Sequence, residues 1–204
     1  NHVSARTILH LDLDAFFVGV YLLDHPEDRG KAVAVGGSPT GRGVVTSASY
    51  EARVFGVHSA MPMWRALRLC PGLKAVRADW ERIRACSQQV MAILARYGPT
   101  EPMSVDEAYV HPGGRVAPET LAAEIRGCEV AETGLGASVG LAATKLVAKV
   151  ASDHGKPGGC VIVPPGTEPA FLAPLPASVI SGIGPRTAER LEELEILTCG
   201  DLAT

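Results

Sequence analysis

The sequence has 204 residues, of which 47% are hydrophobic and 20% are charged. These proportions exclude a disordered, collagen-like or membrane-spanning chain and fit one compact unit or two small ones. Its 19 Lys and Arg residues against 22 Asp and Glu give a formal net charge of −3. The total charge alone therefore does not indicate a nucleic-acid partner.

The cysteine pattern and the ends of the chain indicate a compartment. Five cysteines are odd in number and widely spaced, so they predict reduced, mostly buried thiols and no disulfide framework or metal pair. No apolar run approaches the roughly 20 residues of a membrane-spanning helix. Residues 1–4 also lack the charged and apolar regions of a signal peptide. We therefore expect a cytoplasmic location.

The N-terminal half begins with an acidic strand, which is followed by small elements. Thr7–Leu11 is a β-type run that leads into Asp12-Leu13-Asp14, and Ala15–Leu23 has the length and composition of a helix. Two short strands and two short helices are then expected at Ala32–Val35, Gly43–Ser47, Tyr50–Phe55 and Pro62–Leu69. From Asp79, a predicted N-cap, an apolar stripe predicts a helix that ends at Gly98-Pro99.

The C-terminal half alternates strands and helices. The expected elements are a strand at Met103–Val110, a helix at Pro118–Cys128, a strand at Ala137–Ala142, a helix at Lys145–Ser152 and a short strand at Cys160–Val163. This order is compatible with an α+β fold, a ferredoxin-like sheet with helices on one face. Residues 16–78 would be inserted after the first strand, and residues 166–204 would form a last helical unit.

Two acidic segments are candidates for a metal site. Asp12 and Asp14 share one face of an extended chain, and Mg²⁺ is the usual partner of carboxylates held close together. Ser104-Val105-Asp106-Glu107 is a second acidic pair, which can share a site only at a hairpin bend or strand end. The alternative for Asp12 and Asp14 is the end of a strand whose acids are solvated and bind no metal. The alternative for Asp106 and Glu107 is the tip of a hairpin in water. Together the segments could supply three carboxylates to a pair of metal ions roughly 3.5–4 Å apart, as in phosphoryl or nucleotidyl transfer.

Seven short motifs follow one another along nearly the whole chain. They are Asp12–Phe17, Ala48–Arg53, Gly56–Pro62, Ser104–Tyr109, Gly140–Lys145, Ala148–Asp153 and Lys156–Gly159. Their residues and order resemble the Y-family DNA polymerases, most closely the DinB-like, polymerase IV class. The resemblance implies a template-directed polymerase that adds deoxynucleotides to a primer 3′-hydroxyl by two-metal nucleotidyl transfer, in translesion synthesis and DNA repair.

The resemblance also implies a domain organisation. Residues 1–15 and 79–152 would form the catalytic palm, which contains the ferredoxin-like sheet. Residues 16–78 would form a small inserted fingers subdomain, and residues 153–204 a helical thumb with a helix-hairpin-helix. The family's further DNA-binding domain, the little finger, is absent from this chain, so we expect a piece of a longer protein.

The same resemblance assigns the metal ligands. Asp12 and Asp106 would bind two Mg²⁺ ions through their side chains, Leu13 would contribute its carbonyl, and Glu107 would be the third catalytic carboxylate. Asp14 would not bind the metals directly but would lie next to the residues that do. Such ions activate the primer hydroxyl, position it against the α-phosphate and neutralise the departing pyrophosphate.

Five further residues are assigned to nucleotide binding. Tyr50 and Arg53 are three apart and share a helical face, where a hydroxyl and a guanidinium fork suit a triphosphate. Lys145, at an expected helix start, would add a contact. Phe17 matches the family's steric gate, which excludes the ribose 2′-hydroxyl by a clash. Phe16, in the same segment, is expected to pack in the core, which is also the alternative for Phe17.

The last motif is Gly-rich. Ile180–Pro185 followed by Thr187–Leu194 resembles a helix-hairpin-helix, in which Gly182, Ile183 and Gly184 would offer backbone N–H groups to DNA phosphates. A tight loop is the alternative. The partners implied are primer-template DNA, deoxynucleoside triphosphates and a sliding clamp contacted through a C-terminal region outside this chain. Neither a membrane nor a second copy is expected, so the protein would be a monomer.

Two competing functions and several local features remain. A palm-type nucleotide cyclase could use the same metal chemistry, and a catalytically weak DNA-binding fragment could result from the absent little finger. Tyr21, Thr144 and His111 depart from the family pattern. Trp64 and Trp80 are predicted to lie in the core. The charge is uneven, because residues 41–84 carry eight Lys and Arg against three acids.

Overall fold

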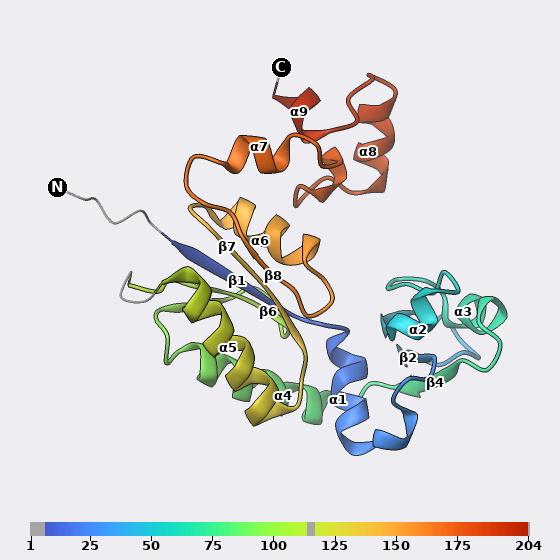
Figure 1. Ribbon diagram of the computed structural model, residues 1–204. Helices are drawn as coiled ribbons and strands as arrows, with labels where there is room; N and C mark the ends of the chain where they lie inside the picture. The colour runs from blue at the N-terminus through green and yellow to red at the C-terminus, as the bar shows by residue number, and fades with distance from the viewer. Residues whose placement is uncertain (1–6, 114–116, 204) are drawn as a thin grey trace. The chain divides into compact units, whose positions relative to one another are not determined.

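The structure is a computed structural model that describes residues 7–113 and 117–203 (Figure 1). Residues 1–4, considered above for a signal peptide, lie outside the described residues. The chain forms two compact units. The first unit combines Asn1–Asp12, Ile93–Gly127 and Ala137–Thr204, and the second combines Leu13–Ala92 and Cys128–Gly136.

The first unit is built on a five-stranded sheet with the order β5-β6-β1-β7-β8. Its strands are β1 (Ile8–Leu13), β5 (Thr100–Pro102), β6 (Glu107–Val110), β7 (Ala137–Ala142) and β8 (Cys160–Ile162). Strand β6 is antiparallel to both β1 and β5, and β8 is parallel to β7. Strands β1, β5, β6 and β7 are arranged in the order expected for the predicted ferredoxin-like sheet. Strand β8, which lies after residue 152, adds a fifth strand at its edge.

Helices cover both faces of this sheet. Helix α5 (Pro118–Thr133) lies on the other side of the sheet from α6 (Lys145–His154) in Figure 1. Helix α6, which was predicted at Lys145–Ser152 as part of a helical layer on one face, packs Ala148 and Ala151 against Ile8 of β1. Because β-strand side chains alternate, α6 covers the face of β1 that carries residues 8, 10 and 12.

A glycine in β7 allows α6 to lie directly on the sheet. A Cβ atom built on Gly140 would lie 2.0 Å from the carbonyl oxygen of Ala148 and 2.4 Å from the backbone nitrogen of Ser152. No side chain fits between these two backbones. The glycine therefore sets the distance between α6 and the sheet, and with it the position of every polar group on that side of α6.

The second unit contains a three-stranded sheet with the order β3-β2-β4. Its elements are α1 (Phe16–Asp24), the short 3₁₀ helix η1 (Pro26–Asp28), β2 (Val33–Gly36), β3 (Val45–Ala48), α2 (Tyr50–Arg53), α3 (Met63–Leu69) and β4 (Lys74–Arg77). Strand β2 is antiparallel to β3 and parallel to β4. Ala52 of α2 and Met63 and Ala66 of α3 pack with Ala34 and Val45 in one apolar core.

A buried carboxylate joins separate elements of the second unit. Asp28 accepts hydrogen bonds from the Tyr21 hydroxyl at 2.7 Å, from Lys74 Nζ at 2.5 Å and from Lys31 Nζ at 3.2 Å. Tyr21 belongs to α1 and Lys74 to β4, so the carboxylate of η1 connects the helix to the edge of the sheet.

Helix α4 (Trp80–Leu94) begins as predicted, because Asp79 accepts a hydrogen bond from the Arg82 backbone N–H at 3.0 Å. The prediction that both tryptophans lie in the core is wrong, since Trp64 is 50% and Trp80 49% exposed. Trp80 stands at the first turn of α4, and Trp64 lies on the side of α3 that faces away from the core.

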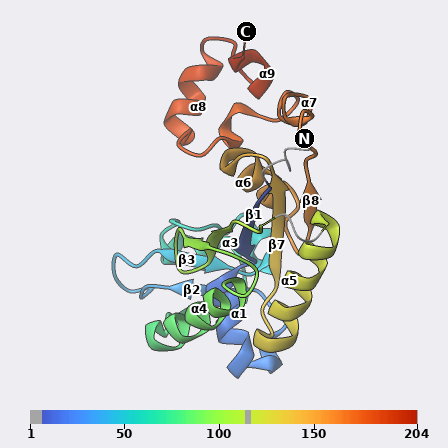
Figure 2. The same cartoon turned by 90° about the vertical axis from the view of Figure 1, so that its left-hand side faces the viewer.

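The last residues form short helices, namely α7 (Glu168–Leu172), η2 (Ala177–Val179), α8 (Pro185–Glu192) and α9 (Cys199–Leu202), of which α7, α8 and α9 are labelled in Figure 2. Within residues 7–113 and 117–203, no helix is both long and apolar enough to cross a membrane. Cys70, Cys86 and Cys199 are buried as free thiols, whereas Cys160 is exposed.

Candidate active site

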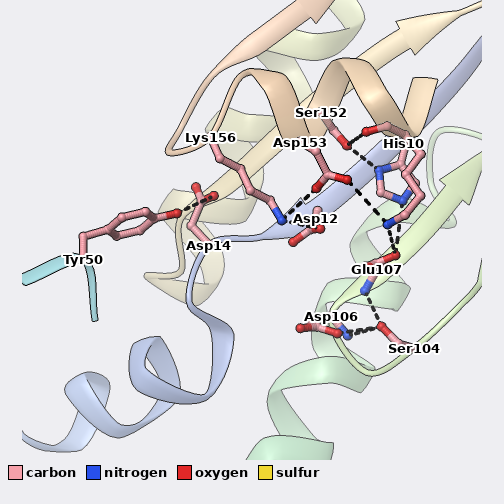
Figure 3. Close-up of polar contacts among 11 residues, drawn as sticks. His10, Asp12, Asp14, Tyr50, Ser104, Asp106, Glu107, Ser152, Asp153 and Lys156 are labelled. Atoms are coloured by element: carbon pink, nitrogen blue, oxygen red, sulfur yellow. Dashed lines mark hydrogen bonds and ion pairs between the residues drawn. The ribbon is translucent and has the colours of Figure 1, made fainter. Parts of the chain in front are cut away.

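The register between β1 and β6 places Asp12 directly opposite Glu107. His10 is opposite Tyr109 two residues earlier, so these four side chains lie on the same face of the sheet. That face is the one covered by α6, as Figure 3 shows. The pairing brings together, from residues 95 positions apart in the sequence, two of the three predicted catalytic carboxylates.

Two lysines hold these carboxylates. Lys156 Nζ donates to Asp12 Oδ2 at 2.6 Å (Figure 3), and Lys149 Nζ donates to Glu107 Oε2 at 2.7 Å. Asp153 lies between the two ammonium groups, 3.0 Å from Lys156 and 3.9 Å from Lys149. We call these five residues the carboxylate–lysine cluster. Its three carboxylates and two ammonium groups leave a surplus negative charge when all are ionised.

The two sheet carboxylates have different environments. Burial raises the pKa of Asp12 to about 6, although the hydrogen bond from Lys156 opposes the shift. The neighbouring His10 ring, followed by Lys149, lowers the pKa of Glu107 to about 2 against its partial burial. Burial lowers the pKa of Lys156, but its bond to Asp12 outweighs that effect and the net direction is upward.

His10 is fully buried between β1 and α6. The Ser152 hydroxyl donates to the Lys149 carbonyl oxygen at 2.8 Å, so its oxygen is free to accept from His10 Nδ1 at 2.6 Å. The other ring nitrogen, Nε2, is buried without a hydrogen-bond partner and lies 3.6 Å from Glu107 Oε2. The ring thus fixes α6 to β1 beside Glu107.

Asp106 stands immediately before β6, at the strand end that a shared site requires. Its carboxylate accepts a hydrogen bond from the Ser104 hydroxyl at 2.6 Å, and Ser104 Oγ in turn accepts from the Glu107 backbone N–H at 3.1 Å. In this structure the Asp106 carboxylate is therefore bonded within its own turn (Figure 3). Its role as a metal ligand stays a prediction.

The donor set fits a hard divalent cation in part. Asp12 and Glu107 offer carboxylate oxygens at neighbouring positions, and each already has a cationic group against it. Across the described ranges, no group of three or more His, Cys, Asp or Glu side chains is arranged to hold a metal ion. The two paired carboxylates fit a metal, and Asp106 would have to turn away from Ser104 to join them. Leu13 ends β1 with its side chain buried.

Lys145 is the first residue of α6, as predicted, and its contact with a triphosphate stays a prediction. Its ammonium group pairs with Glu101 of β5 and lies 5.4 Å from the centroid of the Tyr109 ring. Lys149 and Lys156, not Lys145, contact the paired carboxylates. Both belong to motifs that carried the family resemblance, but no role was predicted for either residue. The signal available was the helical spacing from Lys145 to Lys149, which places them on one side of α6.

Tyr50 and Arg53 lie in the second unit. The predicted shared face is confirmed, since the Arg53 guanidinium carbon lies 4.5 Å from the centroid of the Tyr50 ring. Tyr50 donates to Asp14 Oδ1 at 3.5 Å (Figure 3), and Arg53 Nε donates to the Ala48 carbonyl at 3.0 Å. Ser49 caps α2 by accepting from the Ala52 backbone N–H. Their contact with a triphosphate stays a prediction.

Phe16 and Phe17 begin α1, directly after Ala15 in the left-handed region with φ of 44°. Phe16 is 2% exposed, as expected for a core residue, and Phe17 is 8% exposed. The Phe17 ring lies edge-on to Trp80, with a centroid separation of 5.4 Å. Packing is thus established for both rings, and the gate function of Phe17 stays a prediction.

The three departures from the family pattern each have a local partner. Tyr21 donates to Asp28. Thr144 is the N-cap of α6, where its side chain accepts from the Val147 backbone N–H at 3.3 Å. His111 Nε2 lies 3.7 Å from Glu101. None of these contacts involves Asp12 or Glu107.

The Gly-rich segment forms a turn before α8. Gly182 has a φ of +99°, a conformation that favours glycine, and Gly184 is the N-cap of α8. Ile183 donates its backbone N–H to the Ile180 carbonyl at 3.0 Å. A turn before a helix is compatible with the predicted hairpin, and its contact with DNA stays a prediction.

Known proteins resemble this chain in both sequence and fold. The impB/mucB/samB family profile matches residues 11–153. A DNA polymerase IV of Alkalilimnicola ehrlichii is 45% identical over 205 residues, with 98% of this chain and 58% of that protein covered. DinB from Sulfolobus solfataricus superposes with a TM-score of 0.90 at 32% identity, covering 97% of this chain and 60% of that one. An insertion ternary complex of Dbh DNA polymerase gives a TM-score of 0.87 at 31% identity, covering 94% and 58%.

These matches confirm the resemblance and its extent. The chain spans less than two thirds of the length of each of these relatives. The matched residues 11–153 include Asp12, the turn at Asp106 and Glu107, and Lys149. The chain therefore belongs to the impB/mucB/samB family of Y-family DNA polymerases, and its relatives fall in the DinB-like, polymerase IV class.

Proposed function

We propose that the chain is the catalytic part of a template-directed DNA polymerase, which adds deoxynucleotides to a primer 3′-hydroxyl during synthesis past damaged template. The polymerase IV relative and the Dbh ternary complex support this activity. Within the molecule, the observation that carries the proposal is the pairing of Asp12 with Glu107 across β1 and β6. A register-fixed carboxylate pair beside two lysines suits phosphoryl chemistry.

Asp12 and Glu107, joined by Asp106 after it leaves Ser104, would hold divalent ions, which we propose to be two Mg²⁺. Such ions lower the pKa of an attacking hydroxyl and neutralise charge that develops on the leaving group. Relatives named as DNA polymerases imply a divalent metal, and the oxygen-only donor set favours Mg²⁺ over softer metals.

The lysines have a separate task. Lys149 and Lys156 keep Glu107 and Asp12 in place and compensate their charge. An ammonium group has three N–H donors, and Lys149 uses one of them for Glu107 within hydrogen-bonding distance. The remaining donors suit phosphate oxygens of an incoming nucleotide. Tyr50, Arg53 and Lys145 are proposed as further phosphate contacts, and Phe17 as the residue that excludes a ribose.

Primer extension tests the proposal. The chain is incubated with Mg²⁺, a recessed primer-template and one deoxynucleoside triphosphate at a time. Addition of only the nucleotide complementary to the template supports a polymerase. Consumption of nucleotide without a template supports a cyclase, and DNA binding without either reaction supports a binding module. The last two outcomes contradict the proposal.

A further inference from the structure

The exposed side of α3 carries an unusual combination of side chains. Met63 and Ala66 face the core of the second unit, whereas Trp64, Arg65 and Arg68 are exposed. At about 100° per residue, Trp64 and Arg68 are neighbours and Arg65 lies beside them, opposite the buried side. The remaining exposed leucines, Leu67 and Leu69, lie at the two margins where this surface meets the core. We call Trp64, Arg65 and Arg68 the α3 face (helix labelled in Figure 1).

The chain segment that contains this face carries charge of one sign. Residues 52–78 contain five Lys and Arg and no Asp or Glu. Lys74 is paired with Asp28, but no described carboxylate forms an ion pair with Arg65 or Arg68. The Arg68 guanidinium carbon instead lies 6.0 Å from the centroid of the Trp64 ring. The arginines therefore stand beside an exposed aromatic ring with their hydrogen-bonding capacity unused by acids.

We propose that the α3 face binds an unpaired segment of a DNA strand, with a base stacked on Trp64 and phosphates at Arg65 and Arg68. Proteins that hold single strands combine aromatic rings, on which bases stack, with basic groups that follow the backbone. Arginine also reinforces stacking through its planar guanidinium and binds phosphate as a fork. The inference rests on the proposed function, since a polymerase template is unpaired ahead of the primer end.

The arrangement favours a polyanion over a protein partner. An apolar docking surface would place its leucines at the centre, whereas here they lie at the margins and the two cations occupy the centre with the ring. A basic face in an acid-free chain segment is complementary to a strand that carries one negative charge per nucleotide.

Tryptophan fluorescence provides the first test. The full chain has two tryptophans, so the W80F variant reports on Trp64 alone. Titration with an oligothymidylate of about 12 nucleotides, within the usual site sizes of single-strand grooves, is expected to quench this signal. Saturated binding, measured by anisotropy of a labelled strand, without any change in the Trp64 signal would overturn the proposal.

Substitutions on the α3 face provide the second test. In the wild-type background, W64A is expected to weaken binding of the oligothymidylate by about 5- to 100-fold, the range for a base stacked on one ring, and W64F to restore most of it. R65Q and R68Q should each reduce the slope of log K against log salt by about 0.7. R84Q is the matched control, because Arg84 is also exposed but lies on α4. Equal effects of R84Q and R68Q would reveal only non-specific attraction and contradict the proposal.

Failure of this inference can be separated from failure of the proposed function. Primer extension on a template with a one-nucleotide overhang does not require the α3 face. Extension there, combined with unchanged binding by W64A, would reject the inference and leave the polymerase intact. Quenching and weakened W64A binding without extension would retain the single-strand surface and reject the polymerase. Circular dichroism of each variant checks that the chain is folded.

Discussion

The two units differ in how they arrange charge. In the first unit, Asp12 is buried and Glu107 is partly buried on the sheet face covered by α6, and each has an ammonium group within 2.7 Å. In the second unit, Arg65 and Arg68 are exposed, and no described acid pairs with them. Buried charges need partners that are fixed in place, because desolvation is costly and must be offset. Exposed cations keep their hydration and can bind an anion that comes and goes.

The two regions also differ in what fixes the positions of their charged groups. The carboxylate–lysine cluster is assembled by strand register and by the close seating of α6, so its geometry depends on the core. The α3 face depends only on which side of a short helix is turned outward. Substitutions that disturb the core should therefore affect the cluster, and substitutions on the surface should affect binding alone.

The largest expected effect is the loss of activity in D106A. If Asp106 holds a catalytic ion, its removal forfeits several kcal/mol of transition-state stabilisation, or about a 1,000-fold loss in the rate of primer extension. Asp106 is only partly buried and bonds to Ser104 in its own turn, so the fold should persist. The matched control is E124Q, which removes an exposed carboxylate from α5. Retained extension by D106A would refute the metal assignment.

The next effect tests how far the cluster depends on the seating of α6. In G140A the new methyl group would meet the backbone of α6 at 2.0 Å from Ala148 O, and backbone cannot move aside as a side chain can. We expect a loss of about 3 kcal/mol or more in the free energy of unfolding, at the upper end for overpacked cores, and weaker primer extension. Urea denaturation measures the first quantity.

The control for this substitution is also a glycine. A Cβ atom on Gly127 would meet nothing within 4 Å, and Gly127 lies in α5, where alanine is favoured by about 1 kcal/mol. G127A should therefore stabilise the chain or leave it unchanged. Similar unfolding free energies for both variants would mean that α6 can shift without cost.

A smaller effect is expected at Phe17. If Phe17 is the gate, removal of its ring should reduce discrimination against ribonucleotides by on the order of 10- to 100-fold. Because Phe17 is buried beside Trp80, F17A also creates a cavity, and F17L retains more of the packing. V20A, another truncation of a buried α1 residue, controls for loosening of the helix. Unchanged sugar selectivity in both Phe17 variants would place the gate elsewhere.

The sequence predicted the elements whose pattern is strong and local. Strand β7 occurs at the expected residues Ala137–Ala142, and α4 begins after the predicted cap at Asp79. Strands β4 and β5 were missed, because β4 is a largely exposed edge strand and β5 is three residues long and ends in Pro102. Such strands are formed by pairing with a neighbour, which leaves no periodic signal in the chain itself.

The acidic residues of the site could be predicted from the sequence, whereas the lysines that contact them could not. Asp12, Asp106 and Glu107 stand out because acids interrupt apolar strands. Lys149 and Lys156 carry no such signal, since lysine is common on helix surfaces and in loops. Their contacts arise from the placement of α6 over β1 and β6, which depends on tertiary packing around Gly140. His10 was likewise hidden, as one polar residue in an apolar strand.

The smallest effect is expected at Asp28, the buried carboxylate that joins several elements of the second unit. Lys74 and then Tyr21 lower the pKa of Asp28 below its ordinary value of 3.8 through their hydrogen bonds. A group with a depressed folded-state pKa adds stability above its unfolded pKa, and that contribution is lost as pH falls through the folded pKa. The second unit should thus be acid-sensitive below about pH 4.

D28N removes this charge and leaves the Lys74 ammonium without its partner. We expect a lower urea midpoint at pH 7 than in the wild type, and a difference that narrows as the pH is lowered from about 4 towards 2. Tryptophan fluorescence follows the relevant region, because Trp64 and Trp80 both lie in the second unit. E51Q, which removes an exposed carboxylate of the same unit, should leave the pH dependence unchanged. A D28N deficit that stays constant between pH 7 and pH 2 would mean that Asp28 stabilises this unit through shape and hydrogen-bond count, and not through the paired charge that distinguishes it from the open cations of the α3 face.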